Sequence, residues 1–383
     1  MQDFNFKVPQ DIVFGTGRLS DLPELVHKRA SDHVLIISDR GLADLGVVSK
    51  VEQILTDGGI IVSSFLDVLP NPTVEIVDAA TDCYKKSGAT SIIALGGGSP
   101  MDTAKAVGVL ARYGGSIVSY EGAHKVPGPI EPVIAIPTTA GTGSEVTPFS
   151  VITDEARNHK LTVFSYEILP AQVLLDPQLI MTAPASVASA CGVDAMIHAW
   201  EAYTNLAASP FTDAMAEKAL DLIGSNIRRF VANRRDQEAA EAMMVGSTFA
   251  GFALGWARQG NVHAMSHPVS SFFHVPHGVA NAILLPTIVE YNAIADRGRY
   301  KRIYRFIRRT KGQPIENFTP DMLVAETRQL MADLGMPSTL SEVGVTADKI
   351  EAMADDAMTS GNIAVNPRST TKRDIIALYH KTM

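Results

Sequence analysis

The histidines of this chain are unevenly distributed, and their spacing indicates metal chemistry. Four of the ten histidines, His263, His267, His274 and His277, fall within one short segment. A neutral imidazole is a good ligand for borderline divalent metals, so clustered histidines are candidate ligands. His274 lies between two apolar stretches, and we expect it to be a turn residue without a functional role.

A carboxylate and another histidine lie upstream in an apolar segment. Asp194 and His198 are four residues apart between Cys191 and Trp200, so in a helix both side chains project from one face. A buried carboxylate needs a partner, which can be an imidazole or an ion. A single pair of this kind is more often a hydrogen-bonded structural pair, and only its combination with the downstream histidines favours a metal site.

The spacing of the downstream histidines requires a turn in the chain. On one continuous helix, His277 would lie about 21 Å from His263, which is too far for both to bind one ion. We therefore expect a turn between Phe272 and Pro276, with His277 in the first turn of a new helix. One aspartate and three histidines could then converge from three helical segments. Such a set suits Fe(II), Zn(II), Co(II) or Ni(II) better than Mg or Ca, and the sequence does not select among the four.

A glycine-rich segment indicates a phosphate-binding loop. The apolar strand Ser91–Leu95 runs into Gly96–Gly98, and the helix that follows contains Asp102 and Lys105. Glycines allow the backbone to approach a ligand closely, and the free N–H groups of a helix N-terminus favour an anion such as pyrophosphate. The spacing differs from GxGxxG, so this is not the standard Rossmann fingerprint.

Two further strand ends carry polar residues that suit a dinucleotide. The loop Thr138–Glu145 follows the strand Pro132–Pro137 and offers hydroxyls and glycines. Asp39 follows the strand Val34–Ser38, where a carboxylate could accept hydrogen bonds from the adenosine ribose and repel a 2′-phosphate, which favours NAD over NADP. Each loop alone could be an ordinary turn, but three at the carboxyl ends of strands point to one crevice.

The elements that must position these residues fall into two halves. Short Val- and Ile-rich runs alternate with helical segments in the first half, which is typical of a parallel sheet covered by helices on both faces. The second half is Ala- and Met-rich with helical periodicity. We expect an α/β domain over residues 1–182 and a helical domain over residues 183–383. The expected strands are His33–Ser38, Gly59–Leu66, Ser91–Leu95, Pro132–Pro137 and Gln172–Leu175, with a hairpin of Phe149–Thr153 and Leu161–Phe164. The expected helices of the second half are Ser186–Tyr203, Thr212–Ala232, Gln237–Gly255, Asp321–Leu334, Ala347–Met358 and Thr371–Thr382.

Composition narrows the class of protein. The 383 residues are enough for two domains, and the net charge of −8 makes a nucleic acid an unexpected partner. Two cysteines, Cys83 and Cys191, cannot form a thiolate metal cage and fit a reducing compartment. The first ten residues have no apolar core of a signal peptide, and no uninterrupted apolar run approaches the length of a membrane span. We expect a soluble cytoplasmic protein without a membrane segment.

Taken in order, these motifs resemble those of the iron-containing (group III) alcohol dehydrogenases, and the resemblance covers essentially the whole chain. The motifs that carry it are Phe14-Gly15, Pro70-Asn71-Pro72-Thr73, Gly96-Gly97-Gly98-Ser99-x-x-Asp102-x-x-Lys105, Thr138-Thr139-Ala140-Gly141-Thr142-Gly143-Ser144-Glu145-Val146-Thr147, Gly192-x-Asp194-Ala195-x-x-His198-x-x-Glu201-Ala202, His263-Ala264-Met265-x-His267-Pro268 and Pro276-His277-Gly278-x-x-Asn281.

The resemblance implies a Rossmann-like NAD-binding α/β domain followed by an all-α metal-binding domain, as in dehydroquinate synthase-like proteins, with the active site in the cleft between them. It implies a divalent metal, Fe(II) first and Zn(II) second, held by Asp194, His198, His263 and His277. His267 corresponds to a histidine beside the nicotinamide that influences catalysis without binding the metal, either by relaying the proton to solvent or by orienting its neighbours. Homo-oligomerisation, at least to a dimer, is also implied. The implied coenzyme-binding residues are Asp39, Gly97, Gly98, Ser99, Asp102, Thr138, Thr139, Thr142, Phe149, Lys160 and Leu179.

The reaction implied is the reversible NAD-linked conversion of a small primary alcohol to its aldehyde. One segment departs from the family pattern: before His263, where relatives have small or apolar residues, this chain has Arg258 and Gln259. Arg258 could bind an anionic substrate tail, such as a carboxylate, sulfonate or phosphonate, or it could point into solvent from a helix end. Asn362 stands where relatives often have a cysteine. The alternative functions are a dehydroquinate synthase-like lyase and a non-catalytic coenzyme-binding scaffold.

Overall fold

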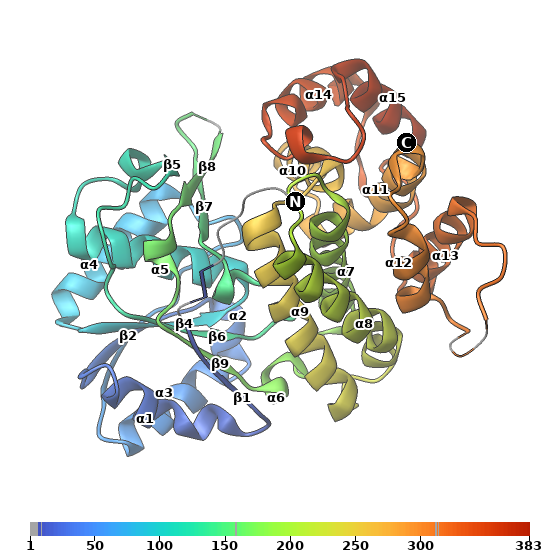
Figure 1. Ribbon diagram of the computed structural model, residues 1–383. Coiled ribbons are helices and arrows are strands. Elements are labelled where there is room, and N and C mark those ends of the chain that lie inside the picture. The colour runs from blue at the N-terminus through green and yellow to red at the C-terminus, as the bar shows by residue number, and fades with distance from the viewer. Residues whose placement is uncertain (1–6, 9, 158, 311, 313) are drawn as a thin grey trace. The chain divides into compact units, whose positions relative to one another are not determined.

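The computed structural model describes residues 7–8, 10–157, 159–310, 312 and 314–383, which form two compact units (Figure 1). The sheet unit comprises Lys7–Thr139 and Gly143–Thr182. The helical unit comprises Ala183–Met383 together with the three residues Ala140–Thr142. The sequence placed all of residues 1–182 in one domain, whereas these three residues pack with the helices.

The sheet unit is built on a six-stranded sheet whose strand order is β1-β9-β6-β4-β2-β3. Every pairing in it is parallel, as the alternation of strands and helices predicted. The central strands are buried along their length, whereas the edge strand β1, which the sequence did not reveal, has only four residues and is half-exposed. The strands are β1 (Asp11–Phe14), β2 (His33–Ile37), β3 (Ile61–Phe65), β4 (Ser91–Gly96), β6 (Val133–Pro137) and β9 (Gln172–Leu175).

Helices cover both faces of this sheet, because alternate residues of each buried strand point to opposite faces. Side chains such as Val34, Ile36 and Ile93 meet the apolar faces of α1 and α3 in one core. Figure 1 shows α1 and α3 on this side and α4 and α5 on the other. The helices of the unit are α1 (Leu22–His27), α2 (Arg40–Asp44), α3 (Val47–Asp57), α4 (Val74–Ser87), α5 (Gly98–Tyr113) and α6 (Pro177–Ile180).

A smaller sheet of order β5-β8-β7 completes this unit. Strands β7 (Phe149–Asp154) and β8 (His159–Phe164) are antiparallel, which confirms the predicted hairpin, and β5 (Gly122–Ala123) pairs with β8.

The helical unit confirms the six helices that periodicity predicted in the second half of the chain. Helices α7, α8 and α9 pack against one another, and α11 packs on α7 and α10. The predicted turn is also present, because α10 ends at Phe273, His274 takes a left-handed conformation, and α11 begins at His277 directly after Pro276. The helices are α7 (Ala185–Thr204), α8 (Pro210–Ala232), α9 (Gln237–Ala257), α10 (Asn261–Phe273), α11 (His277–Asn292), α12 (Tyr300–Ile307), α13 (Pro320–Asp333), α14 (Ile350–Thr359) and α15 (Lys372–Thr382).

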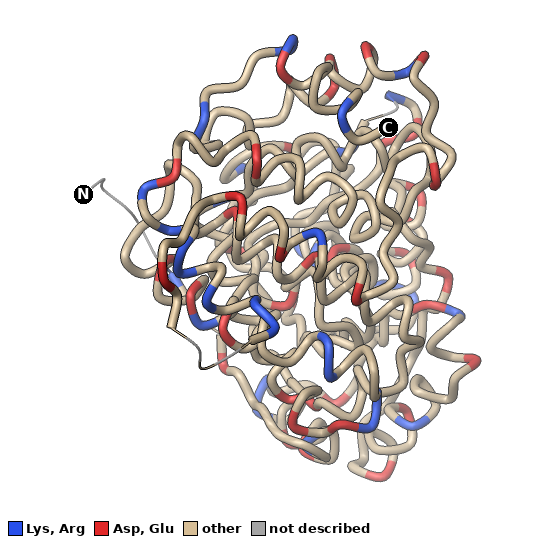
Figure 2. The backbone as a smooth tube through the Cα atoms, turned by 90° about the vertical axis from the view of Figure 1, so that its right-hand side faces the viewer, with Lys and Arg blue, Asp and Glu red and all other residues tan. Residues whose placement is uncertain are grey.

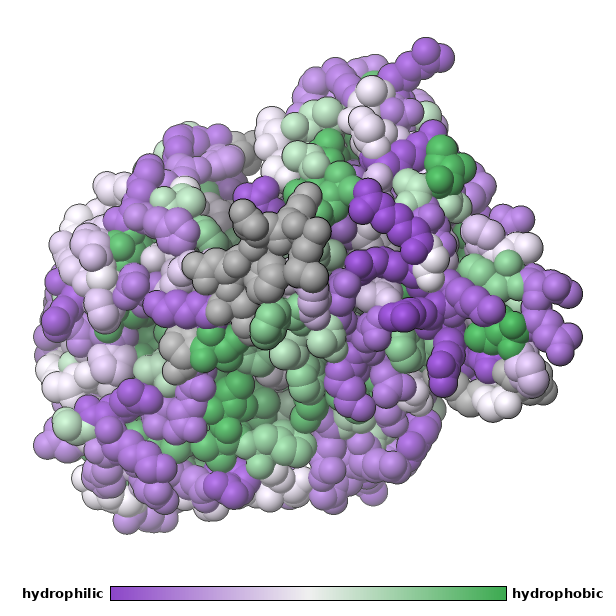
Figure 3. Space-filling model, in the orientation of Figure 1, coloured by the Kyte–Doolittle hydropathy of each residue, from purple (hydrophilic) through white to green (hydrophobic). Residues whose placement is uncertain are grey.

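Surface chemistry is mixed. In the view of Figure 2, Lys and Arg are interspersed with Asp and Glu along the chain, and Figure 3 shows mostly hydrophilic residues on the visible face.

Among the described residues, one helical stretch, His277–Ala295, is long and apolar enough to span a membrane by length and composition. Of its most apolar window, 56% is buried inside the protein, so core packing accounts for its composition and the match is weak evidence for a membrane span.

The contact between α7 and α11 depends on a residue without a side chain. A methyl group at Gly278 would overlap the backbone carbonyl of Ala190 in α7. The absence of a Cβ therefore allows the two helices to approach closely, one residue after the candidate ligand His277.

We predict that Gly278→Ala lowers the free energy of unfolding of the metal-free protein by about 1–3 kcal/mol, the usual cost of overpacking. Denaturant unfolding measures this difference. Gly361→Ala is the matched control, because its methyl group would meet only the flexible end of Arg258 at 3.4 Å. Equal stability of the two variants would show that α7 and α11 can separate at little cost.

Candidate metal centre and coenzyme loops

Three helices of the helical unit bring candidate ligand atoms to one buried carboxylate. Asp194 and His198 lie one turn apart on α7, while His263 comes from the first turn of α10 and His277 from the start of α11. Asp194 Oδ1 lies 3.5 Å from His263 Nε2, 3.7 Å from His277 Nε2 and 3.7 Å from His198 Nε2. Of the four residues that the sequence singled out, the three histidines therefore surround one carboxylate oxygen of the fourth, Asp194.

Within this group, Asp194, His263 and His277 form the tightest set, with ligand atoms all within 4.8 Å of one another. His198 stands slightly apart from that set, and its ring stacks on the ring of His263 with a centroid distance of 4.7 Å. A carboxylate oxygen and imidazole nitrogens that converge in this way fit a borderline divalent ion such as Fe(II) or Zn(II). Assignment of the four as ligands stays a prediction.

The ionisation of this cluster follows from burial and from its neighbours. Burial would raise the pKa of Asp194, but the imidazoles around it hold that pKa well below its ordinary value. Burial lowers the pKa of His198 to about 4. Burial would also lower the pKa of His263, but the carboxylates of Glu201 and Asp194 outweigh it and raise that pKa to about 9. Without an ion, His263 therefore carries the positive charge that the buried carboxylates require, while His198 stays neutral.

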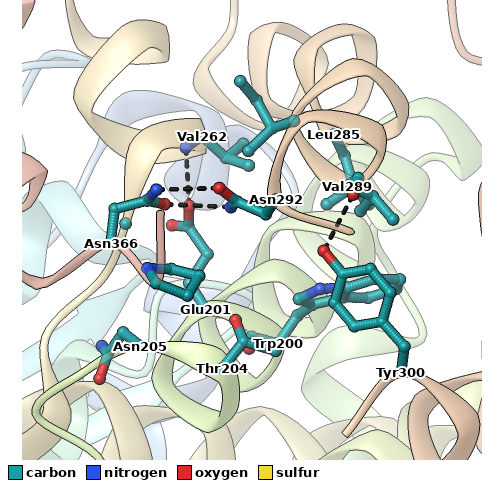
Figure 4. A pocket seen from close by; sticks show the side chains of 13 residues that line it. Trp200, Glu201, Thr204, Asn205, Val262, Leu285, Val289, Asn292, Tyr300 and Asn366 are labelled. Atoms are coloured by element: carbon teal, nitrogen blue, oxygen red, sulfur yellow. Dashed lines mark hydrogen bonds between the residues drawn. The ribbon is translucent and has the colours of Figure 1, made fainter. Parts of the chain in front are cut away.

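Glu201 is a buried carboxylate of this site to which the sequence assigned no role. Its Oε2 lies 2.5 Å from His263 Nδ1, and its Oε1 accepts a hydrogen bond from the backbone N–H of Val262 at 2.7 Å (Figure 4). A carboxylate behind a metal-binding histidine fixes its ring and leaves the other nitrogen free for the ion. The available signal was its position three residues after His198, on the same face of the helix.

Glu201 also lines a small pocket of mixed polar and apolar residues, among which are Asn292 and Asn366 (Figure 4). The side chains of these two asparagines exchange hydrogen bonds, and Asn366 Oδ1 also accepts from the backbone N–H of Asn261. Gly260 offers no side-chain cap for α10. Asn366 and Glu201 instead accept hydrogen bonds from the first free N–H groups of the helix. This arrangement fixes the start of the helix that carries His263.

His267 lies beside the metal cluster and outside the tight set. Its ring stacks on that of His277 with a centroid distance of 5.2 Å and lies 6.1 Å from that of His263. His267 is partly exposed, whereas His263 is fully buried. The structure therefore places it between the cluster and more accessible surroundings.

The glycine-rich loop of the sheet unit has the predicted backbone. Gly96 takes φ +149°, and a Cβ there would lie 2.6 Å from Pro100, so only glycine fits. Gly97 is the N-cap of α5, and Gly98 and Ser99 form its first turn. The backbone N–H of Thr138, after β6, donates to the carbonyl of Gly96. This hydrogen bond joins the two loops at the carboxyl ends of the neighbouring strands β4 and β6. Thr139 is next to them, because its Oγ1 would lie 3.3 Å from a Cβ on Gly97. Five predicted coenzyme residues therefore lie together at the N-terminus of a helix.

Other predicted coenzyme residues have contacts of their own. Asp39 caps α2 by accepting from the N–H of Leu42 at 3.0 Å. Both carboxylate oxygens of Asp102 accept hydrogen bonds, from Ser144 and from the N–H of Val151, so this side chain fixes the smaller sheet to α5.

The remaining four predicted coenzyme residues are scattered. The carbonyl of Phe149 accepts from the buried amine of Lys105, and Lys160 donates to Asn71. Leu179 is buried in the core beside α1 and α3, and Thr142 belongs to the helical unit. None of these contacts tests coenzyme binding, and the assignments stay predictions.

Comparison with known proteins identifies the family. The family model described as iron-containing alcohol dehydrogenase matches residues 9–177, and the model for the C-terminal part of the Fe-containing alcohol dehydrogenase family matches residues 188–383. The chain belongs to the iron-containing alcohol dehydrogenase family. Lactaldehyde reductase from Escherichia coli K12 is 37% identical over 370 residues, which are 96% of each chain.

Solved structures agree with this assignment. A 1,3-propanediol oxidoreductase superposes with a TM-score of 0.96 at 34% identity over the whole of both chains. The sulfoacetaldehyde reductase of Bifidobacterium kashiwanohense, solved with NAD⁺, gives a TM-score of 0.90 at 28% identity and covers 100% of this chain and 99% of its own.

Family membership confirms the main predictions from the sequence. The fold is a Rossmann-like sheet unit followed by a helical unit, and the protein is an NAD-linked, metal-containing oxidoreductase of the alcohol dehydrogenase class. The matches give no support to the lyase or scaffold alternatives.

We predict that Glu201→Gln weakens the binding of a divalent ion about 10–100-fold, because the neutral amide no longer orients and polarises His263. Titration of the metal-free protein against a competing chelator measures the dissociation constant. Glu217→Gln, which alters a carboxylate that pairs with Arg302 elsewhere in the unit, is the control and should bind as wild type does. Unchanged affinity in Glu201→Gln would remove Glu201 from the metal centre.

Proposed function

We propose that this protein interconverts a short primary alcohol and its aldehyde with NAD(H), using Asp194, His198, His263 and His277 to hold a divalent ion. The observation that carries the proposal is the convergence of the three histidines on one buried carboxylate oxygen of Asp194 in a member of this family. Iron(II) is the first candidate and zinc(II) the second. The ion would act as a Lewis acid that stabilises negative charge on the substrate oxygen, while the nicotinamide exchanges the hydride.

His267 is the candidate for moving the proton of the alcohol. Its stacking on the ring of His277 and its partial exposure support a role between the reacting oxygen and solvent. An imidazole suits this task because its pKa lies near neutrality. Asp194, His198, His263 and His277 would hold the ion, and His267 would pass the proton to solvent.

The coenzyme is proposed to lie along the loops that follow β2, β4 and β6. Gly97, Gly98 and Ser99 would offer backbone N–H groups to the pyrophosphate at the N-terminus of α5, and Thr138 and Thr139 would offer hydroxyls beside it. The further candidates are Asp39, which favours NAD over NADP, Asp102, Thr142, Phe149, Lys160 and Leu179.

We expect His267→Ala to keep the bound metal and to lose most of its kcat. NADH oxidation by the Fe(II)- and Zn(II)-loaded proteins, measured without oxygen on short aldehydes, tests both the variant and the reaction. Turnover by wild type should stop with a chelator. An unchanged kcat in the variant would eliminate the proton role, and NADH binding without any turnover by wild type would contradict the proposed reaction.

Arg258 supports a finer proposal, that the substrate carries an anionic tail. It ends α9 with φ 66° and ψ −171°, a conformation that residues other than glycine rarely adopt and that costs about 1–3 kcal/mol. Asn205, buried at the end of α7, holds this strained segment by donating to the carbonyls of Ala257 and Arg258 at 2.6 and 3.0 Å. Strain of this kind persists at functional positions because the surrounding structure enforces it.

The side chain of Arg258 is exposed beside Gly361, and no ion pair to it is found within the described part of the chain. Its neighbour Gln259 accepts a hydrogen bond from Asn362 at 3.2 Å. Asn362, which also departs from the family pattern, is therefore in contact with the residue next to Arg258. An unpaired guanidinium is well suited to a carboxylate, sulfonate or phosphonate. The structural similarity to a sulfoacetaldehyde reductase is consistent with such a substrate.

Arg258→Ala should lower kcat/KM on an acidic short aldehyde at least about tenfold, which corresponds to one lost charge-assisted contact. On a neutral aldehyde of matched size, kcat/KM should change little. Arg373→Ala, which removes an exposed arginine on α15, is the control. Equal losses on the two aldehydes would exclude Arg258 from substrate recognition.

We also propose a cytoplasmic homo-oligomer without a nucleic-acid or membrane partner. Two free cysteines, Cys83 and Cys191, support a reducing compartment, and the resemblance to the family supports the assembly.

A further inference from the structure

Asn281 occupies a central position in the metal cluster. It lies one turn after His277 on α11 and is fully buried. Its side-chain nitrogen Nδ2 lies 2.7 Å from Asp194 Oδ1, 3.3 Å from His263 Nε2 and 3.2 Å from His277 Nε2. One amide nitrogen thus contacts three of the four candidate ligand atoms.

In these contacts the amide nitrogen is a hydrogen-bond donor. The carboxylate oxygen of Asp194 can accept its hydrogen bond, and an imidazole nitrogen can accept one only when that nitrogen carries no proton. The other amide atom, Asn281 Oδ1, is buried and has no hydrogen-bond partner in the part of the chain that the structure describes. Burial of an unsatisfied carbonyl is unfavourable. The contacts of the amide nitrogen with the ligand atoms must therefore hold the amide in this orientation.

We propose that Asn281 is a positioning residue of the metal centre, which orients Asp194 and closes the face of the ligand set formed by Asp194, His263 and His277. A carboxylate oxygen can accept from Nδ2 and still offer a second lone pair to an ion. An imidazole nitrogen has a single lone pair once it is deprotonated, and that lone pair is taken by the ion, so the imidazoles offer the amide no lasting partner. The hydrogen bond to Asp194 therefore holds the carboxylate in place both before and after loading.

This inference rests on the proposed metal centre, and it assigns the amide a purpose beyond packing. A buried asparagine with a merely structural role would need partners for both amide atoms, whereas here the satisfied atom is the one that faces the ligands. Deletion of the amide should therefore affect the ion more than it affects the fold.

Asn281→Ala tests the inference by its effect on metal binding by the metal-free protein. The dissociation constant of Zn(II), measured against a competing chelator, should rise about 10-fold or more. Asn281→Ser, which retains a shorter donor, should lie between Ala and wild type and serves if the Ala variant does not fold. Thr327→Val, which removes a buried hydroxyl hydrogen bond on α13, is the control and should bind as wild type does. Far-UV circular dichroism and NADH binding verify that each variant is folded.

A spectroscopic measurement separates positioning from a general loss of stability. With Co(II) in place of the native ion, the visible absorption of Asn281→Ala should change in intensity and band position, because the opened face admits water, whereas Thr327→Val should match wild type. Wild-type affinity or tighter binding in Asn281→Ala, with an unaltered Co(II) spectrum, would overturn the role of Asn281 and leave the metal centre intact. Failure of the wild-type protein to bind either ion would overturn the metal centre and this inference with it.

Discussion

The helical unit depends on the burial of two carboxylates, Asp194 and Glu201, next to a positive charge. Buried anions are costly unless they are paired, and here His263, which contacts both Asp194 and Glu201, supplies the pairing. In the absence of an ion, the carboxylates of Glu201 and Asp194 raise the pKa of His263, so its proton provides the charge, whereas burial lowers the pKa of His198. A divalent ion can replace that proton, so the site is arranged for a cation whether or not a metal is bound.

Several features of the helical unit position the groups that surround these buried carboxylates. The i, i+4 spacing on α7 presents a carboxylate and an imidazole on one face, and the break after Phe273 brings α11 back to the same point. Gly278 lets α11 approach α7, and Glu201 together with Asn366 holds the start of α10. Each of these features fixes the position of a candidate ligand.

Much of this could be predicted from the sequence, because the signals are local. Periodicity located the helices, the distance between His263 and His277 required a turn, and the glycine run after β4 predicted the loop at the start of α5. Long-range contacts were not visible in this way. The role of Glu201 depends on the side chain of His263, 62 residues away, and that of Asn281 on Asp194, 87 residues away. The clamp of Asn205 on the strained end of α9 likewise joins residues far apart in the chain, and β1 is too short and too exposed for a periodic pattern.

The central claim is that Asp194, His198, His263 and His277 hold one divalent ion. The most direct test is a crystal structure of the iron- or cobalt-loaded protein with anomalous scattering measured at the edge of that metal. The account predicts one strong anomalous peak about 2.0–2.2 Å from Asp194 Oδ1 and from the Nε2 atoms of the three histidines. A peak elsewhere in the protein, or an ion bound without Asp194 or His263, would contradict it.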